Sequence, residues 1–159
     1  MKVIFLDIDG VLQSPRYCVA IGQTGFLQAL EPAALHMLRH LVVEAGAKVV
    51  ISSSWRHGSS KREFNQLFRV LGFKEISNAI HEHWRTADLP HPAKRGDEIK
   101  AWLREHSMVT DYLILDDDDG MLIEQAPYFV RTCPFNGILL DHFEQACRVL
   151  GIKIPGAAA

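Results

Sequence analysis

Two aspartates, placed two positions apart near the start of the sequence, are the residues best suited to chemistry. Asp7 and Asp9 directly follow the apolar run of residues 3–6, and Gly10 lets the chain turn sharply after them. The apolar run is typical of a buried strand. Carboxylates at the end of such a strand are costly without a partner, because burial favours their neutral form. The pair therefore predicts a bound divalent cation, with a solvated acidic turn as the alternative.

A second acidic segment repeats this arrangement later in the chain. Asp116, Asp117, Asp118 and Asp119 follow the apolar residues 112–115. Neighbouring carboxylates repel one another by about 1 kcal/mol each even in water, and a nearby cation reverses that penalty. An acidic run is usually a solvated loop, but this one follows an apolar strand and so also favours a cation site.

Hydroxyl groups that could bind a phosphate follow a third apolar run. Ser52, Ser53 and Ser54 come after the predicted strand 48–51 and before Arg56. Hydroxyls and free backbone amides at the end of a parallel strand can hold a phosphate oxygen. A helix cap would explain three serines about as well, so this segment alone does not decide its role.

A basic pair stands at the start of another predicted helix. Lys94 and Arg95 precede the acidic pair Asp97 and Glu98 in this segment. The helix macrodipole favours acidic residues at this end, so the basic pair asks for a reason other than helix stability. A solvated surface pair would also explain these residues, so this segment alone does not decide their role.

The elements between these segments alternate between strands and helices, which predicts an α/β domain with a parallel sheet. Apolar runs predict strands, and residues repeating at helical spacing predict helices. The predicted strands are 3–6, 48–51, a short one at 75–80, 112–115 and 129–132, and the predicted helices are 32–45, 60–71, a segment from 94, and 141–150. Residues 13–29 predict a small hairpin or flap, and residues 155–159 predict a frayed tail.

These motifs together resemble the haloacid dehalogenase (HAD) superfamily. Residues 7–11, Asp-Ile-Asp-Gly-Val, fit its first motif, Asp-x-Asp-x-Thr/Val, without a mismatch. Its second motif is a Ser or Thr after the next strand, for which Ser53 is the preferred match and Ser52 the alternative. Its third motif is a basic residue at a helix start, and Lys94 and Arg95 fit about equally.

The fourth motif of the superfamily supplies magnesium ligands, and Asp116 and Asp117 match it best. The resemblance implies Mg²⁺ held by Asp7, Asp116, Asp117 and the backbone carbonyl of Asp9. It also implies a three-layer, doubly wound (Rossmann-like) parallel sheet with helices on both faces. Asp118 and Asp119 exceed the pattern, and the sequence leaves their role open.

The resemblance implies a phosphatase rather than a dehalogenase, because dehalogenases lack the second aspartate of the first motif. Asp7 is the expected nucleophile that forms an aspartyl-phosphate, and Asp9 is the expected general acid and base. Ser53 with Lys94 or Arg95 is expected to stabilise charge on the phosphoryl group. The further residues expected to contact the substrate are Gly10, Ser52, Ser54 and Arg56.

Neither interval between the motifs is long enough to predict a full cap domain. An open site suits a large substrate, such as a nucleic-acid end or a phosphoprotein, and an oligomer could also supply cover, although the sequence does not itself predict one. The segments Ser-Ser-Trp-Arg and Arg-Gly-Asp-Glu-Ile-Lys-Ala-Trp-Leu resemble the small HAD domains of RNA-repair phosphatases most. Residues 56–100 hold nine of the 17 basic residues, which could bind a polynucleotide end or simply form a mildly basic face.

Length and composition agree with one cytoplasmic domain over residues 1–159. The chain has 48% hydrophobic and 23% charged residues and a formal charge of −2, which argues against a broad nucleic-acid-binding surface. No secretion signal and no membrane-spanning run is expected. Three widely spaced cysteines predict reduced packing residues, and the pairs His36/His40 and His81/His83 predict structural or surface roles.

Two other functions remain as alternatives at this point. One is a catalytically idle module that binds magnesium or phosphate and acts through partners, against which the intact pair of Asp7 and Asp9 counts. The other is a phosphatase for small metabolites or nucleotides, which the sequence does not separate from one acting on polynucleotide ends.

Overall fold

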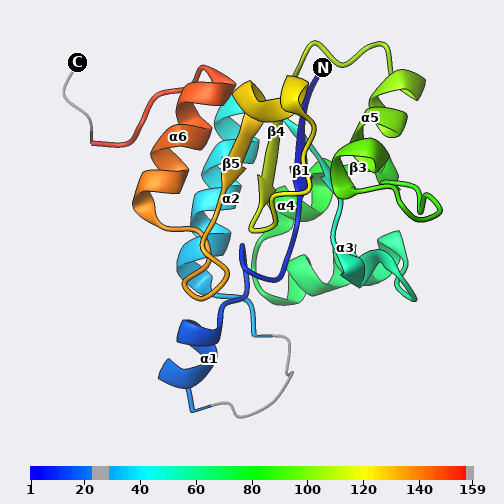
Figure 1. Cartoon of the computed structure of the whole chain (residues 1–159). Coiled ribbons are helices and arrows are strands. Elements are labelled where there is room, and N and C mark those ends of the chain that lie inside the picture. Colours follow the sequence, from blue (N-terminus) through cyan, green and yellow to red (C-terminus); the bar gives the residue numbers. More distant parts are fainter. Residues whose placement is uncertain (23–28, 157–159) are drawn as a thin grey trace.

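A computed structural model describes residues 1–22 and 29–156 of the chain (Figure 1). Its centre is a five-stranded, all-parallel sheet with strand order β3-β2-β1-β4-β5. The strands are β1 (Lys2–Leu6), β2 (Lys48–Ile51), β3 (Ile80–Arg85), β4 (Asp111–Asp116) and β5 (Phe129–Arg131). This arrangement confirms the predicted Rossmann-like α/β fold.

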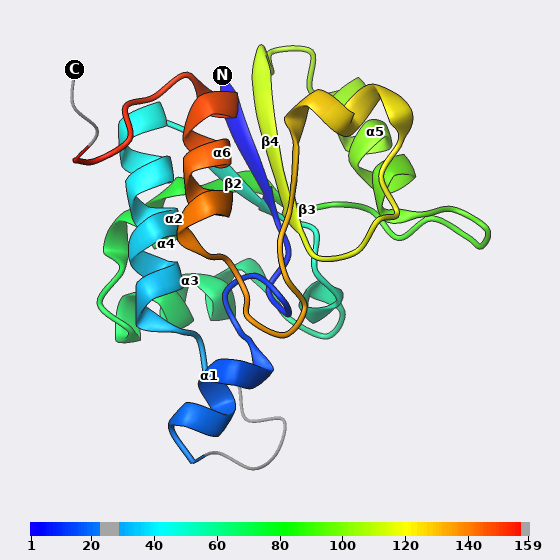
Figure 2. The ribbon, with the colours of Figure 1, turned by 60° about the vertical axis from the view of Figure 1, so that its left-hand side comes forward.

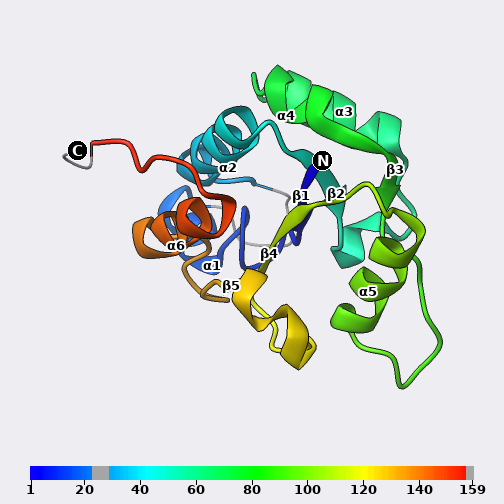
Figure 3. The same cartoon turned by 90° about the horizontal axis from the view of Figure 1, so that it is seen from above.

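Helices lie on both faces of the sheet, which makes three layers (Figures 2 and 3). The α-helices are α1 (Pro15–Ala20), α2 (Pro32–Ala45), α3 (Lys61–Val70), α4 (Lys74–Ala79), α5 (Arg95–Glu105) and α6 (Leu140–Leu150). Two short 3₁₀ helices, η1 (Ser54–Arg56) and η2 (Ile123–Tyr128), follow β2 and β4.

The central strand β1 is buried on both faces because its side chains alternate between two apolar cores. Ile4 and Leu6 belong to the larger core, which α2, α3, α4 and α6 cover. Val3 and Phe5 belong to the smaller core, which α5 covers. All four side chains are fully buried. A continuous apolar run is therefore needed here, since alternation with polar residues would bury polar side chains in one of the two cores.

The ends of the strands bring the predicted motifs to one edge of the sheet. Leu6 of β1 lies level with Ile51 of β2 and with Leu115 of β4. The residues that follow these three positions therefore leave the sheet side by side. The helix α1 lies beyond the same edge (Figure 1).

One local prediction was wrong. Residues 75–80 were expected to form a strand, but 74–79 form α4 and the strand begins at Ile80. The segment after β1 was expected to be a small hairpin or flap. Its described part contains α1, whose start is capped by the Ser14 hydroxyl accepting from the N–H of Tyr17 at 3.2 Å. Residues 23–28 of the predicted flap and 157–159 of the predicted tail lie outside the described residues.

The remaining predicted elements are confirmed to within one or two residues. Gly46 ends α2 in the left-handed conformation, with φ of 59°, as expected for a helix stop. Among the described residues, the first interval between motif segments holds α1 and α2, and the second holds α3, α4 and the edge strand β3, so no cap domain is present there. None of the helices in residues 1–22 and 29–156 is both long and apolar enough to cross a bilayer.

Candidate active site

Three carboxylates from the two acidic segments meet at the carboxyl edge of the sheet. One oxygen each from Asp7, Asp116 and Asp117 lies within 4.8 Å of the others. Asp7 follows β1 and Asp116 ends β4, so the pairing of these two strands sets the contact. Asp7 is 8% exposed and Asp116 only 1%. The structure thus brings together the three side chains that the sequence predicted as metal ligands.

Burial and mutual repulsion make the carboxylates of this cluster hard to ionise unless a positive charge lies nearby. Burial raises the pKa of Asp7 to about 6. Burial and the neighbouring Asp7 carboxylate together raise the pKa of Asp116 to about 7. Oδ2 of Asp116 is buried and accepts no hydrogen bond. A buried carboxylate oxygen without a hydrogen bond, beside two other carboxylates, fits a small divalent cation such as Mg²⁺.

Gly10 allows Asp117 to approach the cluster. Its φ is 68°, and a Cβ at this position would lie 2.4 Å from Cγ of Asp117, which is far inside van der Waals contact. The Gly10 N–H donates to the carbonyl of Gln13 at 2.8 Å, and the Thr132 hydroxyl donates to the Gly10 carbonyl at 2.6 Å. Because its backbone groups are bonded in this way, Gly10 serves to place Asp117 rather than to offer a free amide to a substrate.

Asp9 is exposed at the rim of the cluster and is held by a tryptophan. The indole Nε1–H of Trp55 donates to Oδ2 of Asp9 at 2.9 Å. The Asp9 side chain does not belong to the group of three carboxylates. A carboxylate that is oriented and close to the cluster, but not part of it, is suited to move protons.

The loop of Ser52, Ser53 and Ser54, the serine loop, places its three hydroxyls in different surroundings. Ser53 is fully buried and donates a hydrogen bond that lowers the pKa of Asp7, although burial outweighs it. Ser52 is also fully buried, and its hydroxyl has no partner. Ser54 is exposed at the start of η1. The contact with Asp7 favours Ser53 over Ser52 as the second motif.

Arg95 is the basic residue that reaches the carboxylates. Its Nε lies 3.5 Å from Oδ2 of Asp116, and its Nη1 lies 3.0 Å from Oε2 of Glu98. Its charge also lowers the pKa of both Asp7 and Asp116, against the effect of burial. Lys94 is exposed and forms the N-cap of α5 through its backbone N–H. The structure therefore favours Arg95 over Lys94 for the third motif.

Arg56 lies beneath the serine loop, and the predicted substrate contact does not fit its position. It is 2% exposed and pairs with Asp88 and Glu98, each at 2.9 Å. Its Nη1 also donates to the backbone carbonyls of Ser52 and Ser53. A guanidinium bonded on all sides supports the loop and leaves no donor for a phosphate.

Two residues with a place in the site were missing from the sequence prediction. Trp55 contacts Asp9, and Glu98 joins Arg56 to Arg95. The only sequence signals were that Trp55 follows Ser53 by two positions and that Glu98 follows Arg95 by three. Of the residues whose role was open, Asp118 and Asp119 are exposed, and the backbone N–H of Asp118 donates to Oδ1 of Asp116 at 3.0 Å.

Comparison with known families decides the relationship that the geometry suggests. Residues 3–143 match the family described as the HAD domain in Swiss Army Knife RNA repair proteins. The chain belongs to this HAD family. The matched span includes β1, the serine loop, Arg95 and the second acidic segment. HAD proteins are generally hydrolases, mainly phosphatases, and typically use Mg²⁺, so the family supports a function of the phosphoesterase type. No curated protein and no solved structure is significantly similar to the chain.

Proposed function

We propose that this HAD domain is a Mg²⁺-dependent phosphomonoesterase that works through an aspartyl-phosphate on Asp7. The observation that carries the proposal is the group of the buried Asp7 and Asp116 with the half-buried Asp117, in which Oδ2 of Asp116 accepts no hydrogen bond. Asp7, Asp116 and Asp117, with the Asp9 carbonyl, would hold Mg²⁺. When bound, the ion supplies positive charge that screens the repulsion between a carboxylate and a phosphate.

In the first half-reaction, a carboxylate oxygen of Asp7 forms a bond to phosphorus as the bond from phosphorus to the leaving oxygen breaks. Asp9 donates its proton to that oxygen, so the leaving group departs as an alcohol. In the second half-reaction, Asp9 takes a proton from water, and the resulting hydroxide attacks phosphorus. Inorganic phosphate leaves and the Asp7 carboxylate is restored.

Ser53 and Arg95 stabilise charge during both steps. Ser53 already contacts Asp7, and Arg95 already contacts Asp116, so both stand beside the position of the transferred group. Arg56 and Glu98 hold the serine loop and Arg95 in place through a shared ion pair. Preorganised donors of this kind lower the barrier because they need no reorganisation as charge develops.

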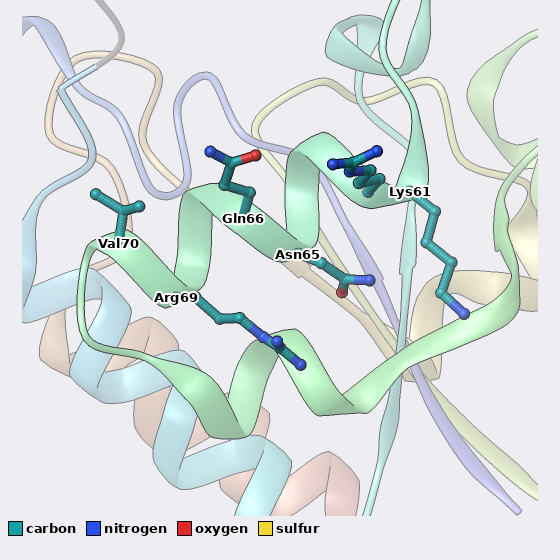
Figure 4. A pocket seen from close by; sticks show the side chains of 6 residues that line it. Lys61, Asn65, Gln66, Arg69 and Val70 are labelled. Carbon is teal, nitrogen blue, oxygen red and sulfur yellow. The ribbon is translucent and has the colours of Figure 1, made fainter.

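We further propose that the substrate is a phosphorylated nucleic-acid end. The RNA-repair description of the family supports this, as does the lack of a cap domain among the described residues. Trp55, which holds Asp9, also lines a hollow of about 220 Å³ with Phe64 and Leu67 of α3. A larger hollow of about 560 Å³ lies along α3 (Figure 4). Its lining is mainly polar and basic: Lys61, Arg62, Asn65, Gln66, Arg69 and Val70. The two hollows share no lining residue. Basic side chains can bind phosphates and aromatic side chains can stack on bases, and each hollow supplies one of these.

Phosphate release from a panel of substrates tests both parts of this proposal. The panel contains small phosphomonoesters, nucleotides, and oligonucleotides phosphorylated at the 3′ or 5′ end, each with and without Mg²⁺. We expect release that requires Mg²⁺, is fastest for an oligonucleotide, and falls by roughly 10³-fold or more in Asp7→Asn. The matched control is Asp119→Asn, which changes an exposed aspartate outside the group of three and should keep activity.

Other outcomes would change the proposal in defined ways. Preference for a nucleotide or a small phosphomonoester would overturn the proposed substrate and keep the reaction. No release from any substrate, together with measurable Mg²⁺ binding, would contradict catalysis and favour a non-catalytic binding module.

A further inference from the structure

Three histidines gather on the outer strand of the sheet, away from the acidic cluster. His81 and His83 lie on β3, which is the edge strand, and their spacing of two residues places both on the same face. His106 follows the last residue of α5, the helix that covers this face. One ring nitrogen from each histidine lies within 4.8 Å of the other two. The three rings are therefore mutual neighbours, although they come from two elements.

The hydrogen bonds of His106 leave one of its ring nitrogens suited to bind a metal. Nδ1 of His106 lies 2.6 Å from the backbone carbonyl of Trp102, and a carbonyl can only accept a hydrogen bond. Nδ1 must therefore carry the proton, which leaves the lone pair of the neutral ring on Nε2. This is the outer contact that usually orients a metal-binding histidine. The indole of Trp102 also stacks on the His106 ring, with centroids 3.6 Å apart, and fixes its plane.

The other two histidines direct nitrogens to the same place. Nδ1 of His83 lies 2.6 Å from Nε2 of His106, so these two nitrogens share a proton when no ion separates them. Nδ1 of His81 accepts from the backbone N–H of His83 at 3.0 Å, so its lone pair is used and the proton of the neutral ring lies on Nε2. His81 therefore becomes a ligand when its ring turns away from this hydrogen bond. Trp102 holds β3 in position as well, because its indole N–H donates to the carbonyl of His83 at 3.1 Å.

We propose that His81, His83 and His106 form a site for a divalent transition metal such as Zn²⁺, with water completing the coordination. Nitrogens bound to one zinc ion at about 2.0–2.1 Å lie roughly 3.3 Å apart in tetrahedral geometry. The His83–His106 pair would open by less than an ångström. His83 is exposed and the other two rings are half-buried, so an ion can enter and the rings can adjust.

The chemistry of the ligands separates this site from the acidic one. Imidazole nitrogen favours Zn²⁺, Ni²⁺ and related ions, whereas Mg²⁺ favours carboxylate and water oxygens. Arg95 begins α5 beside the carboxylates and His106 follows its other end. A helix of 11 residues spans about 16 Å, so the two sites lie at opposite ends of α5. When His83 binds an ion through Nδ1, its proton moves to Nε2, so the ring stays neutral.

Zinc titration of the whole chain, without a histidine tag and with excess Mg²⁺ to occupy the acidic site, tests the proposal. Calorimetry should show one Zn²⁺ per chain, and both His83→Gln and His106→Gln should weaken binding by about 10-fold or more. The matched control is the double variant His36→Gln/His40→Gln, which removes a histidine pair on α2 and should leave binding unchanged.

Nuclear magnetic resonance of the unaltered chain keeps the test independent of variant folding. With ¹⁵N-labelled histidine, the ring nitrogens of three of the eight histidines, His81, His83 and His106, should shift on addition of one equivalent of Zn²⁺. No saturable binding, binding that both variants retain, or shifts confined to other histidines would overturn the proposal. Equal binding of Mg²⁺ by these rings would also overturn it.

Discussion

At the scale of single residues, the proposed chemistry depends on how Asp9 is held. Asp9 is exposed, and exposed side chains usually sample several rotamers. The 2.9 Å hydrogen bond from the Trp55 indole selects one orientation of the carboxylate, next to the buried cluster. An indole N–H can only donate, so it contacts the carboxylate without competing for the proton that Asp9 transfers.

Replacing Trp55 with phenylalanine should therefore slow the reaction at the step that needs Asp9. We expect Trp55→Phe to slow the first step roughly 10-fold for an alkyl phosphate, because a hydrogen bond to a charged group contributes on the order of 1–2 kcal/mol at a partly exposed site. For p-nitrophenyl phosphate the loss in the first step should be smaller, since that leaving group needs little protonation, whereas hydrolysis of the phosphorylated enzyme should slow equally for both. Pre-steady-state kinetics of the first step on both substrates give the comparison.

The control for this change is Trp84→Phe, which alters a half-buried tryptophan packed on Phe64 outside the catalytic contacts. It should leave the ratio of the two first-step rates unchanged. An equal loss in the first-step rate for both substrates in Trp55→Phe would mean that the indole does not act through Asp9.

At the scale of elements, the turn after β1 decides whether the acidic segments can meet. Gly10 has no side chain to collide with Asp117, and the Thr132 hydroxyl donates to the Gly10 carbonyl, which holds the turn against the segment after β5. Parallel pairing of β1 with β4 supplies the rest of the alignment. The cluster is thus a product of strand register and one turn, rather than of any single ion pair.

Substitution of the turn glycine should consequently weaken metal binding. We expect Gly10→Ala to raise the Mg²⁺ concentration needed for half-maximal activity by at least 10-fold, because its Cβ would displace the Asp117 carboxylate. It should also destabilise the fold by at least about 1–2 kcal/mol, the usual cost of a positive φ outside glycine. Activity against Mg²⁺ concentration and denaturant unfolding measure the two effects.

Gly46→Ala is the matched control for backbone strain. Gly46 also has a positive φ, at 59°, but a Cβ there would meet no atom within 4 Å. It should lose stability to a similar extent and keep its Mg²⁺ dependence. If both variants keep the wild-type Mg²⁺ dependence, Gly10 has no part in placing the metal ligands.

The elements that the sequence predicted well are those with long apolar patterns. β1, β2 and β4 are buried runs that end in serines or aspartates, so both the strands and the chemistry at their ends could be inferred. β3 could not, because its residues His81 to Arg85 are mostly polar, as an edge strand allows. A helix of six residues such as α4 is also too short to establish a periodic pattern.

The site was predictable to the same degree. Carboxylates and hydroxyls at strand ends carry a local signal, whereas ion pairs between distant residues do not. Arg56 has the same sequence context as a phosphate-binding arginine, and only the fold shows that it is buried against Glu98 from α5. The choice of Arg95 over Lys94 likewise depends on the direction in which α5 begins.

At the scale of the whole molecule, the carboxylate cluster should make stability depend on pH and on metal. In the folded chain, burial raises the pKa of Asp7 to about 6 and that of Asp116 to about 7, above the usual range of an aspartate. Between about pH 4 and pH 7, the folded chain therefore binds more protons than the unfolded chain. Without metal, this contribution to stability is present below about pH 4 and is lost as pH rises to about 7.

The difference between wild type and Asp116→Asn isolates this contribution. In EDTA, the variant should become more stable than wild type by on the order of 2–4 kcal/mol as pH rises from 4 to 7.5, since it carries no buried charge to repel Asp7. Saturating Mg²⁺ should reverse the order, because only wild type keeps all three carboxylates. Urea unfolding with and without Mg²⁺ provides the values, and Asp119→Asn is the control.

Parallel pH profiles for wild type and Asp116→Asn in EDTA would contradict this account of the cluster. So would an equal gain in stability from Mg²⁺ in the two proteins. Either result would mean that the buried carboxylates neither repel one another in the folded chain nor share an ion.

The central claim is that Asp7 becomes phosphorylated, and the most direct measurement is a burst experiment with Asp9→Asn. With p-nitrophenyl phosphate and Mg²⁺, the first step needs little help from Asp9, whereas hydrolysis of the phosphorylated enzyme does. We predict the rapid release of one p-nitrophenolate per chain, followed by a stall. Reduction with borohydride and peptide mass spectrometry should then find the modified carboxylate at Asp7. Release without a burst, or a burst that leaves Asp7 unmodified, would contradict the account.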